Sequence, residues 1–133
     1  MNDTVTVLIH QEMDIVEARK KGREFTRDLK FGTVNQVRIT TAISELARNI
    51  YLYAGSGKII LEHCQDRGKS GIRITAVDSG PGIPDIKKVL EDGYSTSGGL
   101  GAGVPGVKRL MDEFDIESAV GKGTKITIIK WLK

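Results

Sequence analysis

Apolar residues alternate with polar ones in some parts of this 133-residue chain and recur every three or four residues in others. Alternation is typical of strands that have one buried face, and the longer spacing is typical of amphipathic helices. Five alternating runs predict strands. They cover residues 5–9, 59–63, 72–78, 114–120 and 125–131.

Two long segments with helical spacing follow the first strand. The first starts at Asp14 and Glu17, which have the spacing of a capping box, and carries apolar positions as far as Leu29. Thr33 and Gln36 repeat that spacing and open the second helix. Glycines at positions 55 and 57 are expected to end it. Its predicted buried stripe is Ile39, Ile43, Leu46, Ile50 and Tyr53.

Two shorter helices are expected later in the chain. Pro84 can open one that runs to Leu90, and Pro105 can open another. The buried face of the last helix is predicted to be Val107, Leu110, Met111 and Phe114. The pattern as a whole predicts a single α+β domain over residues 1–133. We expect a two-layer α/β sandwich, with a mixed sheet and its helices packed on one face.

Composition narrows the functional classes. The chain is 39% hydrophobic and 28% charged, as is usual for a globular domain. Its net charge of +3 is mild and the two signs are interspersed, so we expect no nucleic-acid partner. Its apolar runs are too short to cross a membrane. One cysteine, Cys64, fits a reducing, cytoplasmic setting.

A carboxylate and an amide lie one turn apart on the second predicted helix. Glu45 and Asn49 are separated by roughly 40° around the helix axis, so their side chains reach the same patch. A carboxylate there can orient or deprotonate a hydroxyl, and an amide oxygen can bind Mg²⁺. The alternative is a surface pair that makes one weak hydrogen bond.

Glycines become frequent once the third predicted strand ends at Asp78. Gly80 and Gly82 would permit a sharp turn there and the close approach of a flat ligand. The Asp78 carboxylate could then accept a hydrogen bond from an exocyclic amine such as that of adenine. The alternative is an aspartate-initiated turn, which is common.

A glycine-rich segment, residues 91–103, leads into the helix that Pro105 opens. Backbone N–H groups at a helix N-terminus form an anion site, and glycines let a chain wrap phosphate. The alternative is a surface loop. Two literal motif matches are rejected. Gly101–Gly106 matches GxGxxG but does not follow a strand closely, and Ile59 replaces the Ser or Thr of a P-loop after Gly57-Lys58.

Taken in order, these motifs resemble the four ATP-binding motifs of the Bergerat-fold ATPases, which include gyrase, Hsp90, histidine kinases and MutL. The matching positions are Glu45 with Asn49, Asp78–Gly82, Gly98–Gly103 and Gly121–Thr124. In its small size, and in having Ser44-Glu45 before Asn49, the chain resembles the anti-sigma-factor-like serine kinases. Residues 38–53 and 93–103 resemble the stressosome switch kinases within that branch.

The resemblance implies a role for each motif. Glu45 would be the general base, Asn49 would hold Mg²⁺ between the phosphates, and Asp78 would read the adenine amine with the support of Thr124. The segment from Gly98 to Gly103 would be the ATP lid. The implied nucleotide-binding residues are Asn49, Asp78, Gly80, Gly82, Gly98, Gly99, Gly101, Gly103 and Thr124.

The resemblance further implies a Mg-ATP-dependent protein serine/threonine kinase. Its substrates would be STAS-domain scaffold or antagonist proteins. Once released, it would bind the regulatory domain of a PP2C-type phosphatase and activate it, as a partner switch. An alternative is a nucleotide-gated binding module without catalysis, such as an anti-sigma factor, and a third is a degenerate nucleotide pocket. Tyr53 stands where anti-sigma kinases commonly carry His, which counts against sigma-factor binding. Related kinases can dimerise, and the sequence leaves a homodimer open.

Overall fold

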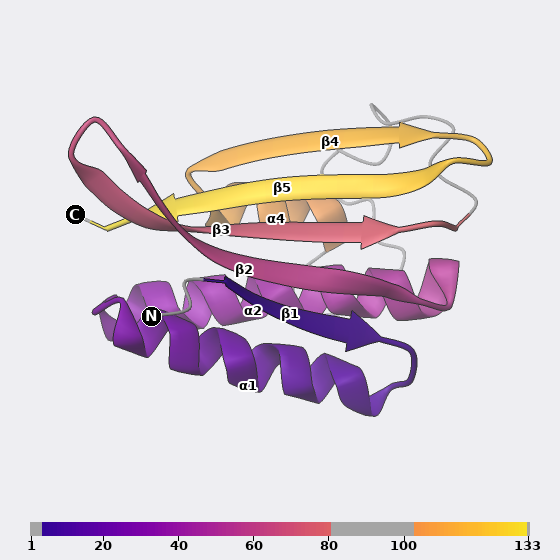
Figure 1. Ribbon diagram of the computed structural model, residues 1–133, viewed down its shortest axis with the longest axis horizontal. Helices are drawn as coiled ribbons and strands as arrows, with labels where there is room; N and C mark the ends of the chain where they lie inside the picture. Colours follow the sequence, from indigo (N-terminus) through magenta and orange to yellow (C-terminus); the bar gives the residue numbers. More distant parts are fainter. Residues whose placement is uncertain (1–3, 81–102, 133) are drawn as a thin grey trace.

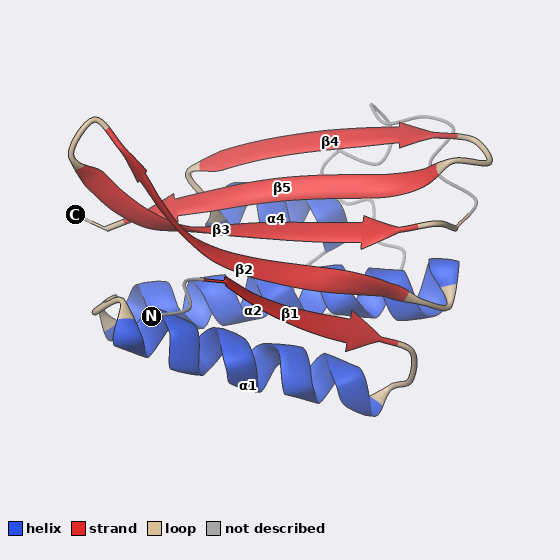
Figure 2. Ribbon diagram, in the orientation of Figure 1, coloured by secondary structure: helices blue, strands red, loops and turns tan. Residues whose placement is uncertain are grey.

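The computed structural model describes residues 4–80 and 103–132. Within them, a five-stranded sheet in the order β1-β2-β3-β5-β4 carries helices on one face, which confirms the predicted two-layer α+β sandwich (Figures 1 and 2). The elements are β1 (Thr4–Ile9), α1 (Met13–Asp28), α2 (Thr33–Asn49), the π-helix η1 (Ile50–Ala54), β2 (Gly57–Asp66), β3 (Lys69–Asp78), α4 (Gly103–Leu110), β4 (Glu113–Ala119) and β5 (Gly123–Trp131).

Neighbouring strands are antiparallel throughout the described sheet, so the expectation of a mixed sheet is wrong. Two helices, α1 and α2, separate β1 from β2. α1 runs back along the sheet and α2 runs forward again, so the chain enters β2 at the end of the sheet where β1 finished. β2 therefore runs against β1. The β2–β3 hairpin turns at Arg67 and Gly68, whose φ angles of 51° and 79° suit a two-residue turn. The strands β3 and β4 do run in the same direction, but β5 lies between them.

The hydrophobic core lies between the sheet and the helices. Ile39, Ile43 and Leu46 of α2 are fully or almost fully buried, as the stripe predicted. They belong to the same buried cluster as Leu61 of β2, Ile74 of β3 and Ile128 of β5. A Cβ at Gly22 of α1 would collide with the Ile43 side chain, so this glycine sets how closely α1 approaches α2.

The start of α1 differs from the predicted capping box. Glu12 is the N-cap residue and its side chain makes no capping hydrogen bond. Asp14 lies inside the first turn, and its Oδ2 accepts the backbone N–H groups of His10 at 2.8 Å and Gln11 at 3.0 Å. These two bonds lower the pKa of the Asp14 carboxyl. The aspartate therefore fixes the β1–α1 connection, and the predicted pairing with Glu17 is wrong.

The second predicted capping box is also wrong. Gly32 is the N-cap residue of α2 and has extended backbone angles, so Thr33 is already helical. The Gln36 side chain does reach back, as in a capping box, but its Nε2 donates to the carbonyl of Phe31 at 2.8 Å. The predicted start of the helix is confirmed, and only the identity of the capping bond changes.

The predicted stripe of α2 fails at its last residue. Tyr53 is 46% exposed because the helix widens into η1 directly after Asn49. A π-helical turn bonds each residue to the fifth one along, which rotates Tyr53 away from the face that carries Leu46 and Ile50. Gly55, with φ of 83°, ends the helix as predicted.

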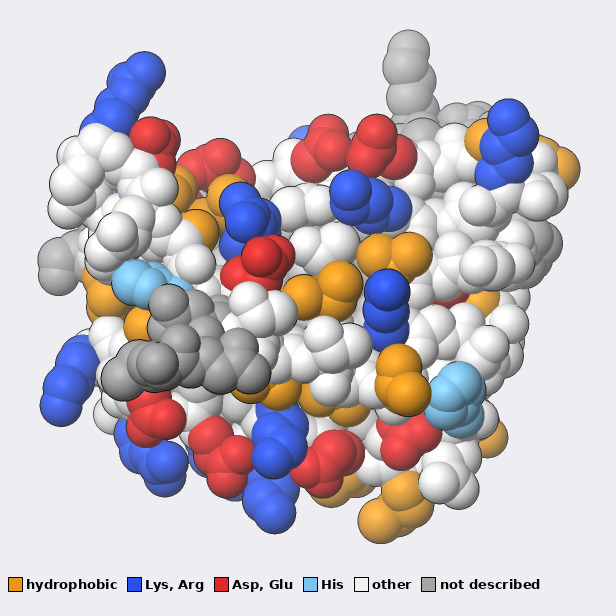
Figure 3. Space-filling model, viewed as in Figure 1, with side chains coloured by type: hydrophobic (Ala, Val, Ile, Leu, Met, Phe, Trp, Pro, Cys, Tyr) orange, Lys and Arg blue, Asp and Glu red, His pale blue; other side chains and the backbone are white. Residues whose placement is uncertain are grey.

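The face of the sheet opposite the helices is open. Figure 3 shows Lys, Arg, Asp and Glu side chains mixed with apolar ones over it, without a broad region of one sign. On this face Arg73 pairs with Glu62 across β2 and β3, at 3.3 Å between Nε and Oε1. No helix among the described residues is long and apolar enough to cross a membrane. The predicted helix over residues 84–90 and most of the glycine-rich segment lie outside the described residues.

Candidate functional site

A row of residues from four strands forms one end of the sheet. Asp78, the last residue of β3, pairs with Gly57 of β2 on one side and with Thr124 of β5 on the other. Thr124 pairs in turn with Ser118 of β4. This end of the sheet, defined by these four residues, is called the site end. Alternation along the strands turns the side chains of Asp78, Thr124 and Ser118 toward the helix layer.

Asp78 begins a turn as it leaves the sheet. Its Oδ1 accepts the backbone N–H of Gly80 at 3.0 Å, which is the aspartate-initiated turn that the sequence offered as the alternative. Within residues 4–80 and 103–132, the structure gives Oδ2 no hydrogen bond. The carboxylate can therefore shape the turn through one oxygen and offer the other to a ligand.

Glycines at the site end let η1 pack directly on the sheet. A Cβ at Gly80 would lie 2.6 Å from Cβ of Ala54, and one at Gly57 would lie 2.8 Å from Cγ2 of Ile50. Gly80 therefore permits a close contact between two parts of the protein, and its predicted place beside a ligand stays a prediction. The consequence is that the C-terminal end of α2 lies against the strand end that carries Asp78.

Gly123 has the tightest position at the site end. Its φ is 86°, which L-residues rarely adopt, and a Cβ there would collide with the backbone oxygen of Asp78. The next residue, Thr124, shares a hydrogen bond of 2.9 Å with Ser118 through their hydroxyl groups. Ser118 Oγ also donates to the carbonyl of Gly123 at 2.9 Å. These bonds hold the turn of the β4–β5 hairpin beside Asp78.

Glu45 lies one helical turn before the end of α2 and is only 2% exposed. Its Oε1 accepts a hydrogen bond from Nη1 of Arg48 at 2.7 Å, the short distance expected of a charge-assisted bond. The sequence analysis missed Arg48. Its spacing of three residues from Glu45, with the acid nearer the N-terminus, was the available signal.

Asn49 leaves a polar atom without a partner. Its Oδ1 is buried and accepts no hydrogen bond from any described residue. Ser44 Oγ is in the same condition on this helix. Buried polar atoms in native proteins are normally satisfied, so the oxygen without a partner makes Asn49, beside the site end, a candidate for ligand binding. An amide oxygen is a donor that Mg²⁺ accepts.

The part of the chain that the structure describes contains no group of three or more His, Cys, Asp or Glu side chains that could hold a metal ion. Mg²⁺ commonly takes most of its oxygen ligands from water and from phosphates.

The remaining predicted site residues divide into two groups. Gly103 opens α4, is buried and has φ of 69°, so the segment that enters this helix needs glycine there. The others lie outside the described residues. They are Gly82, Gly98, Gly99 and Gly101.

Ser118 is a second residue that the sequence analysis missed. The spacing of the β4–β5 hairpin contained the signal, because pairing outward from the turn that includes Gly121 and Lys122 sets Ser118 opposite Thr124. A hydroxyl there can orient Thr124, which had been assigned a supporting role beside Asp78.

Comparison with known proteins places this geometry among nucleotide-binding domains. The model of the family described as histidine kinase-, DNA gyrase B-, and HSP90-like ATPase matches residues 34–133. The serine/threonine-protein kinase RsbT of Bacillus subtilis (strain 168) is 66% identical over 133 residues, which is 100% of both chains. An anti-sigma F factor of Thermoanaerobacter sp. (strain X514) is 32% identical over 98 residues, 71% of this chain and 68% of that protein.

Solved structures share the fold at low sequence identity. The RsbU and RsbW domains of a Mycobacterium tuberculosis protein match with a TM-score of 0.70 and 16% identity, over 99% of this chain and 34% of that one. The catalytic domain of the histidine kinase ThkA matches with a TM-score of 0.54 and 17% identity, over 95% of both chains.

Proposed function

Because this chain belongs to the histidine kinase-, DNA gyrase B- and HSP90-like ATPase family and is an ATP-dependent serine/threonine-protein kinase of the RsbT type, we propose that its acceptor is a Ser or Thr of a STAS-domain scaffold or antagonist protein. Identity of 66% over the full length of both chains supports an activity shared with that relative. We propose the cytoplasm as its place of action.

The observation that carries the proposal is the pairing of two buried groups on α2. The buried Glu45 carboxylate accepts a hydrogen bond from Arg48 and lies one turn from Asn49. The buried Oδ1 of Asn49 has no hydrogen-bond partner among the described residues. In the proposed mechanism Glu45 accepts the proton of the acceptor hydroxyl as the hydroxyl oxygen attacks the γ-phosphorus of ATP, and the bond from that phosphorus to ADP breaks so that ADP leaves. Asn49 would hold Mg²⁺, which would supply charge neutralisation on the phosphates. Phosphoryl transfer asks for positioning and charge neutralisation above all, and these groups supply both.

Asp78 and Thr124 are proposed to hold the adenine. They are direct neighbours across β3 and β5, and Ser118 orients the threonine hydroxyl. Oδ2 of Asp78 can accept from the exocyclic amine while Oδ1 stays in its turn with Gly80. Gly80 and Gly82 are proposed to let the flat adenine approach the backbone, and the segment with Gly98, Gly99, Gly101 and Gly103 is proposed to be the ATP lid, as the family resemblance implies.

Partner switching completes the proposal. After phosphorylating its substrate, the kinase would leave it and activate a PP2C-type phosphatase by binding its regulatory domain. The support is the similarity to RsbT together with the resemblance of residues 38–53 and 93–103 to the switch kinases.

A second candidate function is a binding module that ATP or ADP gates without catalysis. The anti-sigma F factors that match about seven tenths of this chain favour it. Glu45 discriminates between the two, since a protein that only binds needs no carboxylate beside the γ-phosphate. Its burial and its bond to Arg48 favour the kinase.

The test is transfer of label from γ-labelled ATP, with Mg²⁺, to a recombinant STAS-domain protein of the same organism. We expect label on a Ser or Thr and a loss of about 100-fold or more in Glu45→Gln and Glu45→Ala, with ATP affinity retained. Glu62→Gln is the matched control, because Glu62 is also paired with an arginine but lies on the open face of the sheet. Saturable ATP binding without any transfer would establish the binding module instead.

A further inference from the structure

Arg48 and Glu45 differ sharply in how much solvent they meet. The Arg48 side chain is 35% exposed and that of Glu45 is 3% exposed, although Nη1 and Oε1 are only 2.7 Å apart. The guanidinium therefore reaches inward from the surface of α2 to a carboxylate that the fold has removed from water. None of the roles assigned above falls on Arg48.

A buried carboxylate needs compensation for its lost hydration. The planar guanidinium supplies charge and a directional N–H donor together, which a point charge does not. A hydrogen bond from Arg48 to Oε1 restricts the rotamer of Glu45 and the plane of its carboxylate. A general base must itself lie within hydrogen-bond reach of the proton that it removes. The contact with Arg48 therefore restricts the orientation of the Glu45 carboxylate.

We propose that Arg48 is a positioning residue for phosphoryl transfer, acting through Glu45. This rests on the proposed function, in which Glu45 is the base. Arg48 holds the carboxylate in the orientation from which it accepts the proton of the acceptor hydroxyl. No atom of Arg48 is required to contact the nucleotide or the acceptor.

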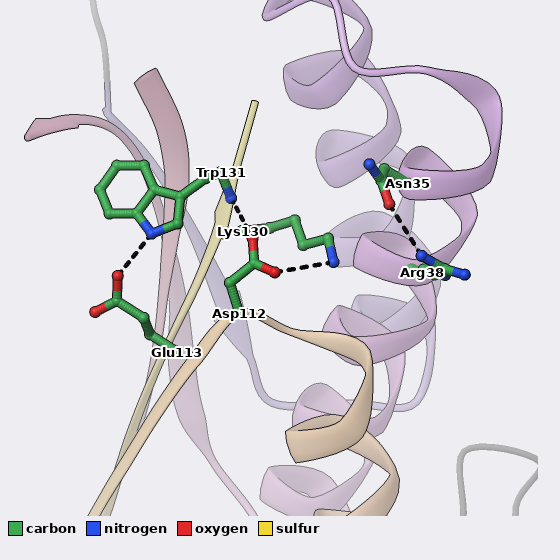
Figure 4. Close-up of polar contacts among 6 residues, drawn as sticks. All are labelled: Asn35, Arg38, Asp112, Glu113, Lys130 and Trp131. Carbon is green, nitrogen blue, oxygen red and sulfur yellow. Dashed lines mark hydrogen bonds and ion pairs between the residues drawn. The ribbon is translucent and has the colours of Figure 1, made fainter. Parts of the chain in front are cut away.

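The same helix contains a matched arginine. Nη1 of Arg38 donates to Oδ1 of Asn35 at 3.4 Å, with the same three-residue spacing (Figure 4). That contact is exposed, long and made to a neutral amide. Arg38 and Arg48 therefore share residue type, helix and spacing, and differ in whether the partner is a buried carboxylate.

The experiment measures kcat and KM for ATP and for the recombinant STAS-domain acceptor in Arg48→Ala, Arg48→Lys and Arg38→Ala. We expect Arg48→Ala to lower kcat about 10-fold to 100-fold with little change in the KM for ATP, since general-base catalysis contributes about 10²–10⁴ in rate. Arg48→Lys should recover part of that loss because it returns a charged donor. Arg38→Ala should match the wild type.

A double variant separates positioning from a general structural effect. Adding Arg48→Ala to Glu45→Gln should lower kcat further by less than about twofold, because the group through which Arg48 acts is already lost. A multiplicative loss would show that Arg48 acts independently and would overturn the proposal. If Arg48→Ala fails to fold by circular dichroism, Arg48→Gln, which keeps the stem without the charge, carries the same expectation.

Two outcomes distinguish this inference from the function on which it rests. Wild-type kcat in Arg48→Ala, beside a large loss in Glu45→Gln, overturns the positioning role and leaves the kinase mechanism intact. Wild-type kcat in Glu45→Gln removes the base itself, and the role of Arg48 with it.

Discussion

At the end of the sheet far from the candidate site, each side chain that Figure 4 shows on β4, on β5 and on the connection from α4 to β4 has a partner. Lys130 Nζ lies 3.3 Å from Asp112 Oδ1, Asp112 Oδ2 accepts the backbone N–H of Trp131 at 2.8 Å, and the Trp131 indole donates to Glu113 at 2.6 Å. These four residues define the closed end. At the site end, by contrast, the buried Oδ1 of Asn49 has no partner among the described residues.

The difference separates polar groups that stabilise the fold from one that is proposed to bind a ligand. The closed end compensates a buried lysine internally, so its bonds contribute to folding. The site end instead relies on glycines to bring backbone segments together, and the neighbouring Asn49 has a buried oxygen without a partner among the described residues. Substitutions of the polar residues at the closed end and of the glycines at the site end should change stability, whereas substitution of Asn49 should change nucleotide binding.

The largest effect is expected for Gly123→Ala. The substitution combines an unfavourable positive φ with a collision between Cβ and the Asp78 carbonyl, so the free energy of unfolding should fall by about 3 kcal/mol. Gly121→Ala is the control, since it has φ of 79° and open space around it, and it should cost about 1 kcal/mol. Urea denaturation of both variants measures the difference, and equal losses would contradict the tight contact at Gly123.

Asp112→Ala should follow, with a loss of about 2–3 kcal/mol in stability. The substitution leaves the buried Lys130 ammonium without its carboxylate and frees the N–H of Trp131. ATP affinity, measured by calorimetric titration, should stay at the wild-type value. Asp115→Ala changes an exposed residue of β4, three positions along the chain, and is the control. It should shift stability by less than about 0.5 kcal/mol. A large loss of ATP affinity in Asp112→Ala would remove the distinction between the two ends.

Asn49→Ala should show the opposite pattern. Its stability should stay within about 0.5 kcal/mol of the wild type, because no hydrogen bond to Oδ1 is lost. Its affinity for ATP with Mg²⁺ should fall about tenfold, which corresponds to about 1.4 kcal/mol. Titration with EDTA in place of Mg²⁺ should abolish the difference. If Asn49→Ala still binds ATP more weakly than the wild type without Mg²⁺, Asn49 does not act through the cation. Asn35→Ala, on the same helix, is the control for loss of an amide.

The smallest effect concerns Cys64 on the open face of the sheet. Burial raises the pKa of its thiol above the ordinary value, although the nearby Arg73 guanidinium opposes this. The thiolate is the reactive form, so its alkylation by iodoacetamide near pH 8.5 should be several-fold slower in the folded protein than in urea. Because the pKa of the thiol is higher in the folded protein than in the unfolded chain, the free energy of unfolding falls as the pH rises above the pKa of the unfolded thiol. Equal alkylation rates would show that the thiol is not desolvated.

Most of the architecture could be predicted because it depends on periodicity. The strand that ends at Asp78 and the helix that carries Glu45 and Asn49 were found from apolar spacing alone. The antiparallel pairing could not be read in this way, since it depends on how many helices intervene between two strands. The exposure of Tyr53 was missed because a π-turn changes the phase of the helix without any local sequence signal.

The candidate site shows the same limit. The motifs led to Asp78 and Thr124 as candidate site residues. They did not show that the two are direct strand partners, because that requires the register of β3 against β5. For Gly80 the sequence suggested the approach of a ligand, and the structure adds a close contact with Ala54 of η1. A glycine signals that something comes close, and only the fold shows what that is.

The row from Gly57 through Asp78 and Thr124 to Ser118 joins two hairpins, β2–β3 and β4–β5, that lie far apart along the chain. No isolated hairpin can form it, so a nucleotide that binds there recognises the completed domain and not its unfolded chain. By mass action, ATP at about 100 times its dissociation constant would then add about 2.7 kcal/mol to the free energy of global unfolding. The supply of substrate would in this way also set the lifetime of the enzyme.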